Sequence, residues 1–245
     1  MECRSIRKRV RRVVLDFADD AQPGLQPDRR AALLLGTRHA ARAGARLSPS
    51  RFGVSGLGTC GAMNRMKPKK LRLTPRHGWR AQANHKILVI GRGAVRLEYP
   101  ETWVVEITDD CVKLHDKEPP DDDCVLGVSY HRWPPVTAPT LTVAALVRGA
   151  MESDERKFVA LDPIVEETRI DVSLAWSQAR FIDPGVNREA CARLCIARKD
   201  EIQALITFDF WLTDLERCHA HWNDFLATLQ LAQWVADPRA GPLLS

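Results

Sequence analysis

Apolar residues near the C-terminal end of the chain change from one regular spacing to another. From Ala204 to Phe210 every second residue is apolar, which is the pattern of a β-strand with one buried face. After Asp214 the spacing becomes three or four residues, as on a helix with one buried face. The apolar positions there are Leu215, Cys218, Trp222, Phe225, Leu226 and Leu229. Thr213 and Glu216 have the spacing of a capping box. The pattern predicts a strand followed by an amphipathic helix that packs on a sheet.

Shorter alternating segments predict a series of antiparallel strands before this point. They cover residues 86–90, 94–99, 103–108, 111–115, 125–132, 166–172, 174–182 and 188–198. The last of these contains alanines, which favour a helix, but its alternation favours a strand. Gly91 and Gly93 separate the first two strands, since glycine tolerates the positive φ of a tight turn. An apolar stripe predicts a further helix over residues 142–153. Because hairpins exclude a series of βαβ units, the predicted fold class is α+β, an antiparallel sheet with helices packed on its faces.

Charge divides the chain into two parts. Residues 1–85 hold nineteen Lys or Arg and five Asp or Glu, whereas residues 86–245 hold seventeen and twenty-six. The net charge of +5 therefore combines a basic N-terminal part with an acidic remainder. We predict a basic N-terminal extension of low order over residues 1–82, an α+β domain over 83–236 and a C-terminal tail over 237–245.

The composition of residues 1–62 has two interpretations. Arginine, alanine and glycine are abundant there, as expected when GC-rich DNA is translated upstream of the true start, which would then be Met63 or Met66. The alternative is a genuine basic arm or a targeting peptide, and Asp16 and its acidic neighbours argue against targeting. A short helix over residues 13–17 is the most structure that the pattern supports here.

The apolar runs of the chain are short and interrupted by charge, so no secretory signal or membrane span is predicted. The seven cysteines are odd in number and scattered, which suits free thiols in a reducing compartment. We therefore expect a cytoplasmic protein.

The densest group of acidic residues lies in a polar segment between two predicted strands. It contains Asp116, Glu118, Asp121, Asp122 and Asp123. The alternating ligands and central glycine of a calcium-binding loop are missing from it. A solvated loop is the simpler interpretation, and a surface that meets a basic partner is the functional one. These five residues form the candidate partner surface.

Motifs of cofactor, metal or catalytic sites are poorly supported. Residues 56–61 match a dinucleotide-binding fingerprint, but no strand precedes them and no amphipathic helix follows. Cys218, His219 and His221 resemble part of a metal site, yet on a helix His219 would point away from the other two. No activated serine or cysteine is recognisable. We therefore assign no catalytic, cofactor or metal residue.

Residues 97–103, Leu-Glu-Tyr-Pro-Glu-Thr-Trp, look like the opening strand, proline and tryptophan of the PsbP-like fold family. That family includes the photosystem II extrinsic protein P and the Ran-binding nuclear import factor. The central helix, the run of hairpins and the ending over residues 208–231 are similar as well. The resemblance covers about residues 95–231 and implies an α/β/α sandwich. It also implies a small binding or assembly module, since most family members serve in that way.

The sequence thus leads to a non-catalytic protein-binding or assembly module whose protein partner is unknown. Two alternatives stay open. One is an enzyme or small-ligand-binding protein whose pocket is built from separated residues. The other is a nucleic-acid binder that uses the basic N-terminal arm to neutralise phosphates.

Overall fold

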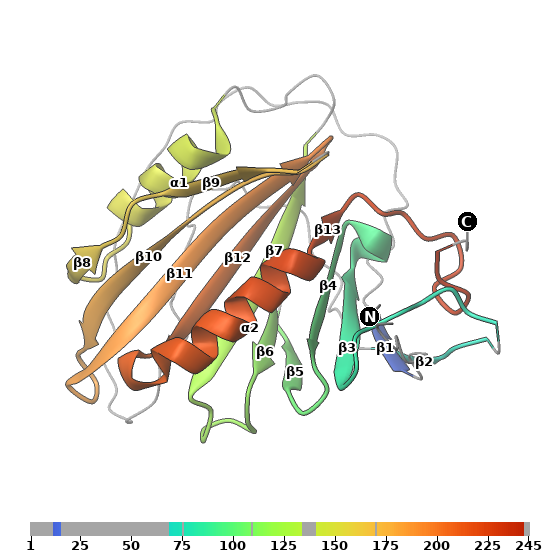
Figure 1. The fold of residues 1–245 in the computed structure, drawn as a ribbon, viewed down its shortest axis with the longest axis horizontal. Coiled ribbons are helices and arrows are strands. Elements are labelled where there is room, and N and C mark those ends of the chain that lie inside the picture. Colours follow the sequence, from blue (N-terminus) through green and yellow to red (C-terminus); the bar gives the residue numbers. More distant parts are fainter. Residues whose placement is uncertain are drawn as a thin grey trace, which may run out of the picture.

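The computed structural model describes residues 12–15, 69–74, 76–108, 110–133, 141–169 and 171–242, with 12–15 and 69–72 described as backbone. Most of the predicted basic extension lies outside the described residues, as do the fingerprint at 56–61 and the start sites predicted at Met63 and Met66. Across the described ranges the chain forms two sheets and two α-helices (Figure 1).

The larger sheet is antiparallel and has the strand order β5–β6–β7–β12–β11–β10–β8, with β9 also paired to β10. Its strands are β5 (Val104–Ile107), β6 (Val112–His115), β7 (Cys124–Arg132), β8 (Phe158–Leu161), β9 (Val165–Thr168), β10 (Ser173–Asp183), β11 (Arg188–Lys199) and β12 (Ile202–Trp211). The strands β10, β11 and β12 follow one another as hairpins. In contrast, β12 pairs with the distant β7, with Ile202 opposite Arg132.

The smaller sheet has the order β13–β4–β3–β1–β2. Its strands are β1 (Arg12–Leu15), β2 (Lys69–Arg72), β3 (His85–Ile90), β4 (Val95–Pro100) and β13 (Gln230–Leu231). The turn between β3 and β4 is the short 3-10 helix η1 (Gly91–Gly93), in which Gly91 has φ 56° and Gly93 has φ 104°. At Gly91 a Cβ atom would also lie 2.3 Å from the hydroxyl of Tyr130. Glycine is therefore required here, as the sequence predicted.

The two α-helices cover opposite faces of the larger sheet. Helix α1 (Val143–Glu152) packs on β10 and β11, and helix α2 (Leu215–Thr228) crosses the other face and also contacts β4 (Figure 1). The larger sheet is thus the middle layer of an α/β/α arrangement. The second sheet lies beside α2, so α2 is packed on two sides.

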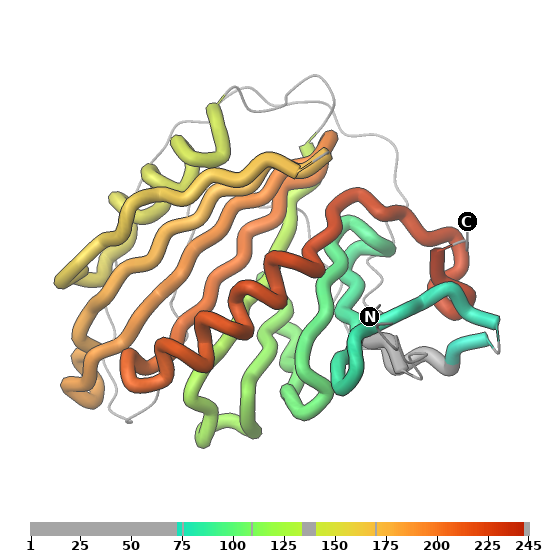
Figure 2. The backbone as a smooth tube through the Cα atoms, viewed as in Figure 1, coloured from blue at the N-terminus to red at the C-terminus, as the bar shows by residue number. Residues whose placement is uncertain are grey.

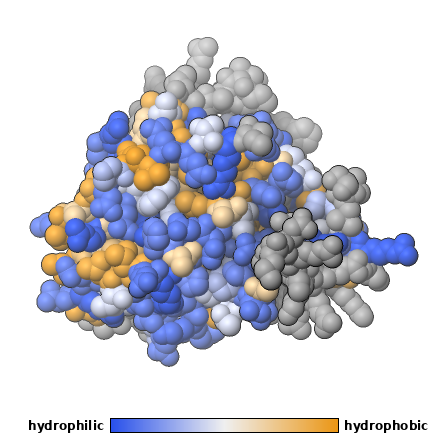
Figure 3. All heavy atoms as spheres, viewed as in Figure 1, coloured by the Kyte–Doolittle hydropathy of each residue, from blue (hydrophilic) through white to orange (hydrophobic). Residues whose placement is uncertain are grey.

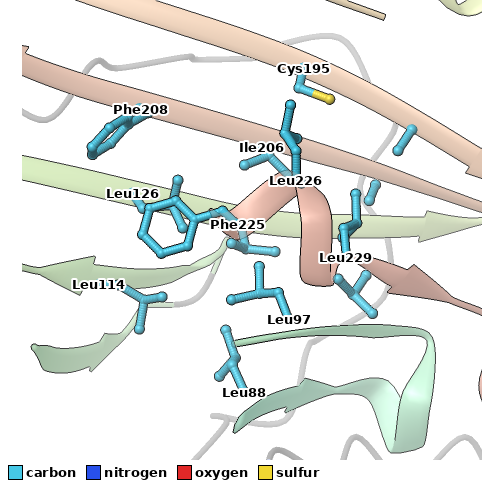
Figure 4. Packing of buried hydrophobic residues seen from close by; sticks show 14 of the residues in the cluster. Leu88, Leu97, Leu114, Leu126, Cys195, Ile206, Phe208, Phe225, Leu226 and Leu229 are labelled. Carbon is cyan, nitrogen blue, oxygen red and sulfur yellow. The ribbon is translucent and has the colours of Figure 1, made fainter. Parts of the chain in front are cut away.

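The core between the two sheets is centred on α2. Its residues Cys218, Trp222, Phe225 and Leu226 are buried, as the helical spacing predicted, whereas Leu215 of the same predicted stripe is 36% exposed. Trp222 stacks on Phe208 of β12 with ring centroids 6.1 Å apart and planes at 4°. Figure 4 shows Phe225 between Leu97 of the smaller sheet and Leu126 of the larger one. One helix face therefore joins both sheets in a single hydrophobic cluster.

The start of α2 differs from the sequence prediction. The predicted capping box of Thr213 and Glu216 does not form, and the 3-10 turn η3 (Leu212–Asp214) leads into the helix instead. The Thr213 hydroxyl accepts a hydrogen bond from Nη2 of Arg188 at 2.7 Å. Thr213 lies inside this 3-10 turn and the N-cap position of α2 is Asp214, so the Thr213 hydroxyl is not placed to cap the helix. Helix α1 does have a side-chain cap, in which the Thr142 hydroxyl accepts from Ala145 N–H.

Segments before residue 83 and after residue 236 pack against each other. The Trp79 side chain is 1% exposed, and its Nε1 donates to the carbonyl of Pro238 at 2.8 Å. The backbone N–H of Thr74 donates to the carbonyl of Arg239 at 3.0 Å. Gly241 lies against the indole of Trp79, where a Cβ would be 2.8 Å from the ring. Figure 2 shows these two segments side by side at one end of the molecule.

The predicted α+β class is confirmed, and residues 188–198 lie in β11 as their alternation indicated. Strand β8 was not predicted, and the strand predicted at 166–172 is shorter. The helix suggested at 13–17 is wrong, since residues 12–15 form β1, which runs parallel to β3. None of the helices described is long and apolar enough to cross a bilayer.

Trp222→Ala should destabilise the protein by about 3–5 kcal/mol, because it removes a fully buried ring that joins α2 to the sheet. Urea unfolding followed by circular dichroism measures the change. Trp234→Ala is a suitable control, since Trp234 is 48% exposed. Equal effects of the two substitutions would show that the stacking of Trp222 does not stabilise the fold.

Candidate functional site

The acidic loop, residues 116–123, connects β6 to β7 and reaches α2. Asp116 accepts hydrogen bonds from the backbone N–H groups of Asp123 and Cys124 at 2.9 and 3.2 Å, and from Nη1 of Arg217 at 2.8 Å. Burial alone would raise the pKa of Asp116, but the hydrogen bonds from Arg217 and the two backbone groups outweigh it and lower the pKa. Asp116, whose side chain is 4% exposed, therefore ties the loop to α2.

Asp122 also turns inward. Its carboxylate lies 3.1 Å from Nδ1 of His115, and Nε2 of the same ring lies 3.1 Å from Glu106. Two carboxylates thus share one buried imidazole, and an imidazolium ion would donate to both. Within the described ranges, no three His, Cys, Asp or Glu side chains are placed to hold a metal ion.

Three of the five predicted residues remain on the outside of the acidic loop. Glu118 and Asp121 are exposed, and Asp123 forms an ion pair with Lys117. This pair is solvated and screened by salt, so its carboxylate stays accessible. The structure therefore leaves one side of the loop able to meet a basic partner, and that contact stays a prediction.

A second surface runs along the outer side of β10. Strand β9 pairs with residues 173–176 of β10, and β8 pairs with residues 179–181. No further strand of the described chain pairs with β8 or β9, and we call these two strands the open edge. An unpaired edge presents backbone N–H and C=O groups to which another strand can add.

Apolar side chains are exposed along the open edge. Val159, Leu161 and Val165 are 67%, 51% and 44% exposed. Figure 3 shows apolar surface at the left of the molecule, where β8 lies in the matching view of Figure 1. Natural edge strands are usually protected by charge, proline or a covering element. Exposed apolar residues at an unpaired edge are typical of a binding surface.

Acidic residues accompany the apolar ones. Three acidic side chains are exposed on or directly beside the open edge: Asp162, Glu166 and Glu167. The carboxylate of Glu167 accepts a hydrogen bond from Nε of Arg169 at 2.7 Å. The open edge therefore combines unpaired backbone, apolar contacts and negative charge.

A buried arginine lies under α2. Arg193 of β11 is 2% exposed, and its Nε donates to Oε1 of Gln178, directly opposite on β10, at 2.8 Å. Its Nη2 lies 3.2 Å from Nδ1 of His219, which is exposed on α2. Gln178 Nε2 in turn donates to Asp162 at 2.9 Å. Arg193, Gln178 and His219 form what we call the arginine centre.

Aromatic rings, rather than a carboxylate, surround the charge of Arg193. The centroids of Trp176, Phe210 and Trp222 lie 5.2 to 5.7 Å from its Cζ, and it has no ion pair with any described carboxylate. Burial lowers the pKa of Arg193, but an arginine stays charged in a protein. Each desolvated cation–π contact contributes roughly 2 kcal/mol, so the three rings together offset much of the penalty of several kcal/mol for burying an ion. No described carboxylate pairs with the charge.

Cys218, His219 and His221 do not converge on one point, and His219 lies on a different side of α2 from Cys218, as the helical spacing predicted. Cys218 is fully buried, whereas His219 is exposed beside Arg193. His221 is half-buried, with its ring centroid 5.3 Å from that of Trp103. Burial, followed by the charge of Arg217, lowers the pKa of His221.

The cysteines of the described chain are free thiols. Burial raises the pKa of Cys191 to about 11 and also raises the pKa of Cys195, while a hydrogen bond with Cys218 and burial raise that of Cys124. Such thiols stay protonated at neutral pH and are poor nucleophiles.

The fold defines an α+β protein with an antiparallel sheet between helices, and the comparisons place the chain in a family. The Alr1449 family model matches residues 86–235. The uncharacterized protein alr1449 of Nostoc sp. (strain PCC 7120) is 34% identical over 172 residues, which cover 70% of this chain and 90% of that protein. This chain belongs to the Alr1449 family.

Solved structures with a similar chain path include two proteins of the fold family that the sequence resembles. Cyanobacterial PsbP (CyanoP) of Synechocystis sp. PCC 6803 is 15% identical, with a TM-score of 0.43, covering 71% of this chain and 98% of its own. The Ran-binding protein Mog1p of Saccharomyces cerevisiae is 10% identical, with a TM-score of 0.43, covering 60% and 95%. The similarity concerns the fold.

Two features of the site were not foreseen from the sequence. The open edge was missed because Phe158–Leu161 is a run of four apolar residues with no alternation. The arginine centre was missed because Arg193 occupies an apolar-facing position in an alternating strand. An arginine between Cys191 and Cys195, on the face that those cysteines share, was the available indication.

Asp116→Ala should destabilise the protein by about 2 kcal/mol, because it leaves two backbone N–H groups without their acceptor and removes the partner of Arg217. Urea unfolding at neutral pH measures the loss. The matched control is Asp121→Ala in the same loop, which should change stability by less than about 0.5 kcal/mol. Similar values for both would refute the anchoring role of Asp116.

Acidification should destabilise the protein through His221. Its pKa in the folded state lies below the ordinary value of 6.5, so the unfolded chain binds the proton first as the pH falls through 6.5. The unfolding free energy therefore rises with pH in this range, and the gain is complete above it. Urea midpoints between pH 5 and 7.5 should depend less on pH in His221→Gln than in the wild type. An unchanged slope would contradict this.

Proposed function

We propose that this member of the Alr1449 family is a non-catalytic protein-binding module whose open edge takes up an extended segment of a partner protein. One observation carries the proposal: β8 and β9 are unpaired on their outer sides while Val159, Leu161 and Val165 are exposed on them. Strand addition to a sheet edge uses backbone hydrogen bonds for affinity and alternate side chains for selectivity.

The charge of the open edge indicates the chemistry of the partner. Asp162, Glu166 and Glu167 are exposed there, so a segment with alternating apolar and basic residues fits best. Apolar side chains would contact Val159 and Leu161, and Lys or Arg would pair with the carboxylates. Complementary charge would mainly increase selectivity and the association rate.

The acidic loop offers a second negatively charged surface. Glu118, Asp121 and Asp123 keep their carboxylates at the surface. We therefore propose the open edge as the principal surface and the loop as an additional one.

We also propose a cytoplasmic location. The described cysteines are free and mostly buried, which suits a reducing compartment. Thiol titration of the protein isolated from its native host under alkylating conditions tests this. Disulfide-linked cysteines in that sample would refute it.

A photo-crosslinking amino acid at Val159 of the full chain, expressed in its native host, tests the open edge. The crosslinked segment of the partner, identified by mass spectrometry, should be extended and rich in Lys or Arg. The double substitution E166K and E167K should reduce the adduct about tenfold through charge reversal.

The same crosslinker at Arg148, exposed on α1 at another face, is the matched control. At Asp121 it reports on the acidic loop. An adduct at Val159 no stronger than at Arg148, or one to an acidic segment, would overturn the proposal for the open edge. An adduct at Asp121 alone would transfer the binding surface to the loop.

A further inference from the structure

We infer that the arginine centre binds a small monovalent anion, of the size of chloride or formate, at the guanidinium of Arg193. The inference is independent of the open edge. It concerns the opposite side of β10, where α2 crosses the sheet.

The hydrogen bonds of Arg193 are incomplete. Nε donates to Gln178 and Nη2 lies against His219, but Nη1 is buried and, among the described residues, has no hydrogen-bond partner. The indole Nε1 of Trp222, whose ring lies 5.7 Å from Cζ of Arg193, is likewise buried without an acceptor. Both groups are donors only, so one aromatic cluster contains two donors and lacks acceptors for them.

The missing acceptor should carry negative charge. A water molecule would satisfy hydrogen bonds but would leave the guanidinium charge buried among Trp176, Phe210 and Trp222. The nearest carboxylate in the hydrogen-bond chain is that of Asp162, and Gln178 stands between it and Arg193. Gln178 is neutral, so it relays no countercharge. An anion at Nη1 completes both the hydrogen bonding and the charge.

The surroundings restrict the size of the anion and give it a path. Arg193 is 2% exposed and three aromatic rings lie 5.2 to 5.7 Å from its Cζ, so we infer a small anion rather than a large polyvalent one. His219 is exposed on α2 and contacts the guanidinium directly, so rotation of its side chain opens a route from solvent. Arg180 lies two residues after the buried Gln178 on the same face of β10, and its exposed side chain adds positive potential at that side.

The test uses the full chain and the variant R193M, which keeps the length of the side chain and removes the charge. Unfolding is measured with increasing sodium chloride or sodium formate at constant ionic strength, balanced with sodium gluconate. At an anion concentration ten times the dissociation constant, the unfolding equilibrium constant of the wild type should fall about tenfold. R193M should show no such change, and R180M should respond as the wild type does.

Chloride NMR linewidths provide a second readout that does not depend on stability. Excess broadening of the chloride resonance by the wild type, reduced by formate and absent with R193M, is expected. An effect of formate without chloride broadening would identify a carboxylate ligand. Equal salt responses of the wild type and R193M, together with equal linewidths, would overturn the inference and indicate a neutral acceptor.

The substitution Q178E keeps the test decisive if R193M fails to fold. It places a carboxylate at the position where Gln178 Oε1 now accepts from Arg193 at 2.8 Å. The internal ion pair should abolish the stabilisation by chloride and formate, and combining Q178E with D162N avoids a second carboxylate opposite the new one, since Asp162 now accepts from Gln178 Nε2 at 2.9 Å. A Q178E protein that responds to these anions as strongly as the wild type would contradict the inference.

Discussion

The rest of the structure depends on the aromatic contact between α2 and the middle of the larger sheet. Trp222 and Phe225 lie against Phe208, and Phe225 also faces the smaller sheet through Leu97. Two sheets that share no strand are therefore held together by one helix. Burial of side chains of this size stabilises by roughly 1.5–3 kcal/mol each, so a few rings supply an energy comparable with the net stability of a domain.

Polar contacts fix the position of α2 at the points where this apolar packing ends. Asp116 accepts a hydrogen bond from Arg217 near the start of the helix. Arg193 of the sheet contacts His219, two residues further along the same helix. The two contacts differ in kind. The carboxylate of Asp116 has its hydrogen bonds completed, whereas the guanidinium of Arg193 does not. The first is a structural anchor, and the second has unused binding capacity.

The sequence predicted elements whose period was regular and failed where a segment had no period or where the local backbone departed from the expected turn. Residues 188–198 and the stripe containing Trp222 were predicted correctly because alternation and helical spacing each recur over several positions. Strand β8 was missed because four consecutive apolar residues have no period, and the cap at Thr213 failed because a 3-10 turn over Leu212–Asp214 moves the start of the helix past it.

The candidate site was predictable only in part, for a similar reason. Composition located the acidic loop, but local spacing could not show that Asp116 and Asp122 turn inward, since that depends on Arg217 and His115 from other elements. The Alr1449 family model matches residues 86–235, and Trp79 lies outside this range.

The packing of Trp79 on Pro238 has a consequence for the connectivity of the fold. The backbone of Thr74 is hydrogen-bonded to that of Arg239, so the two ends of the segment 74–239 meet at one point. Adjacent ends of this kind are what circular permutation requires. We therefore expect that this segment can be circularly permuted. Its two ends would be joined and new termini opened in a surface turn, while the same three layers are retained.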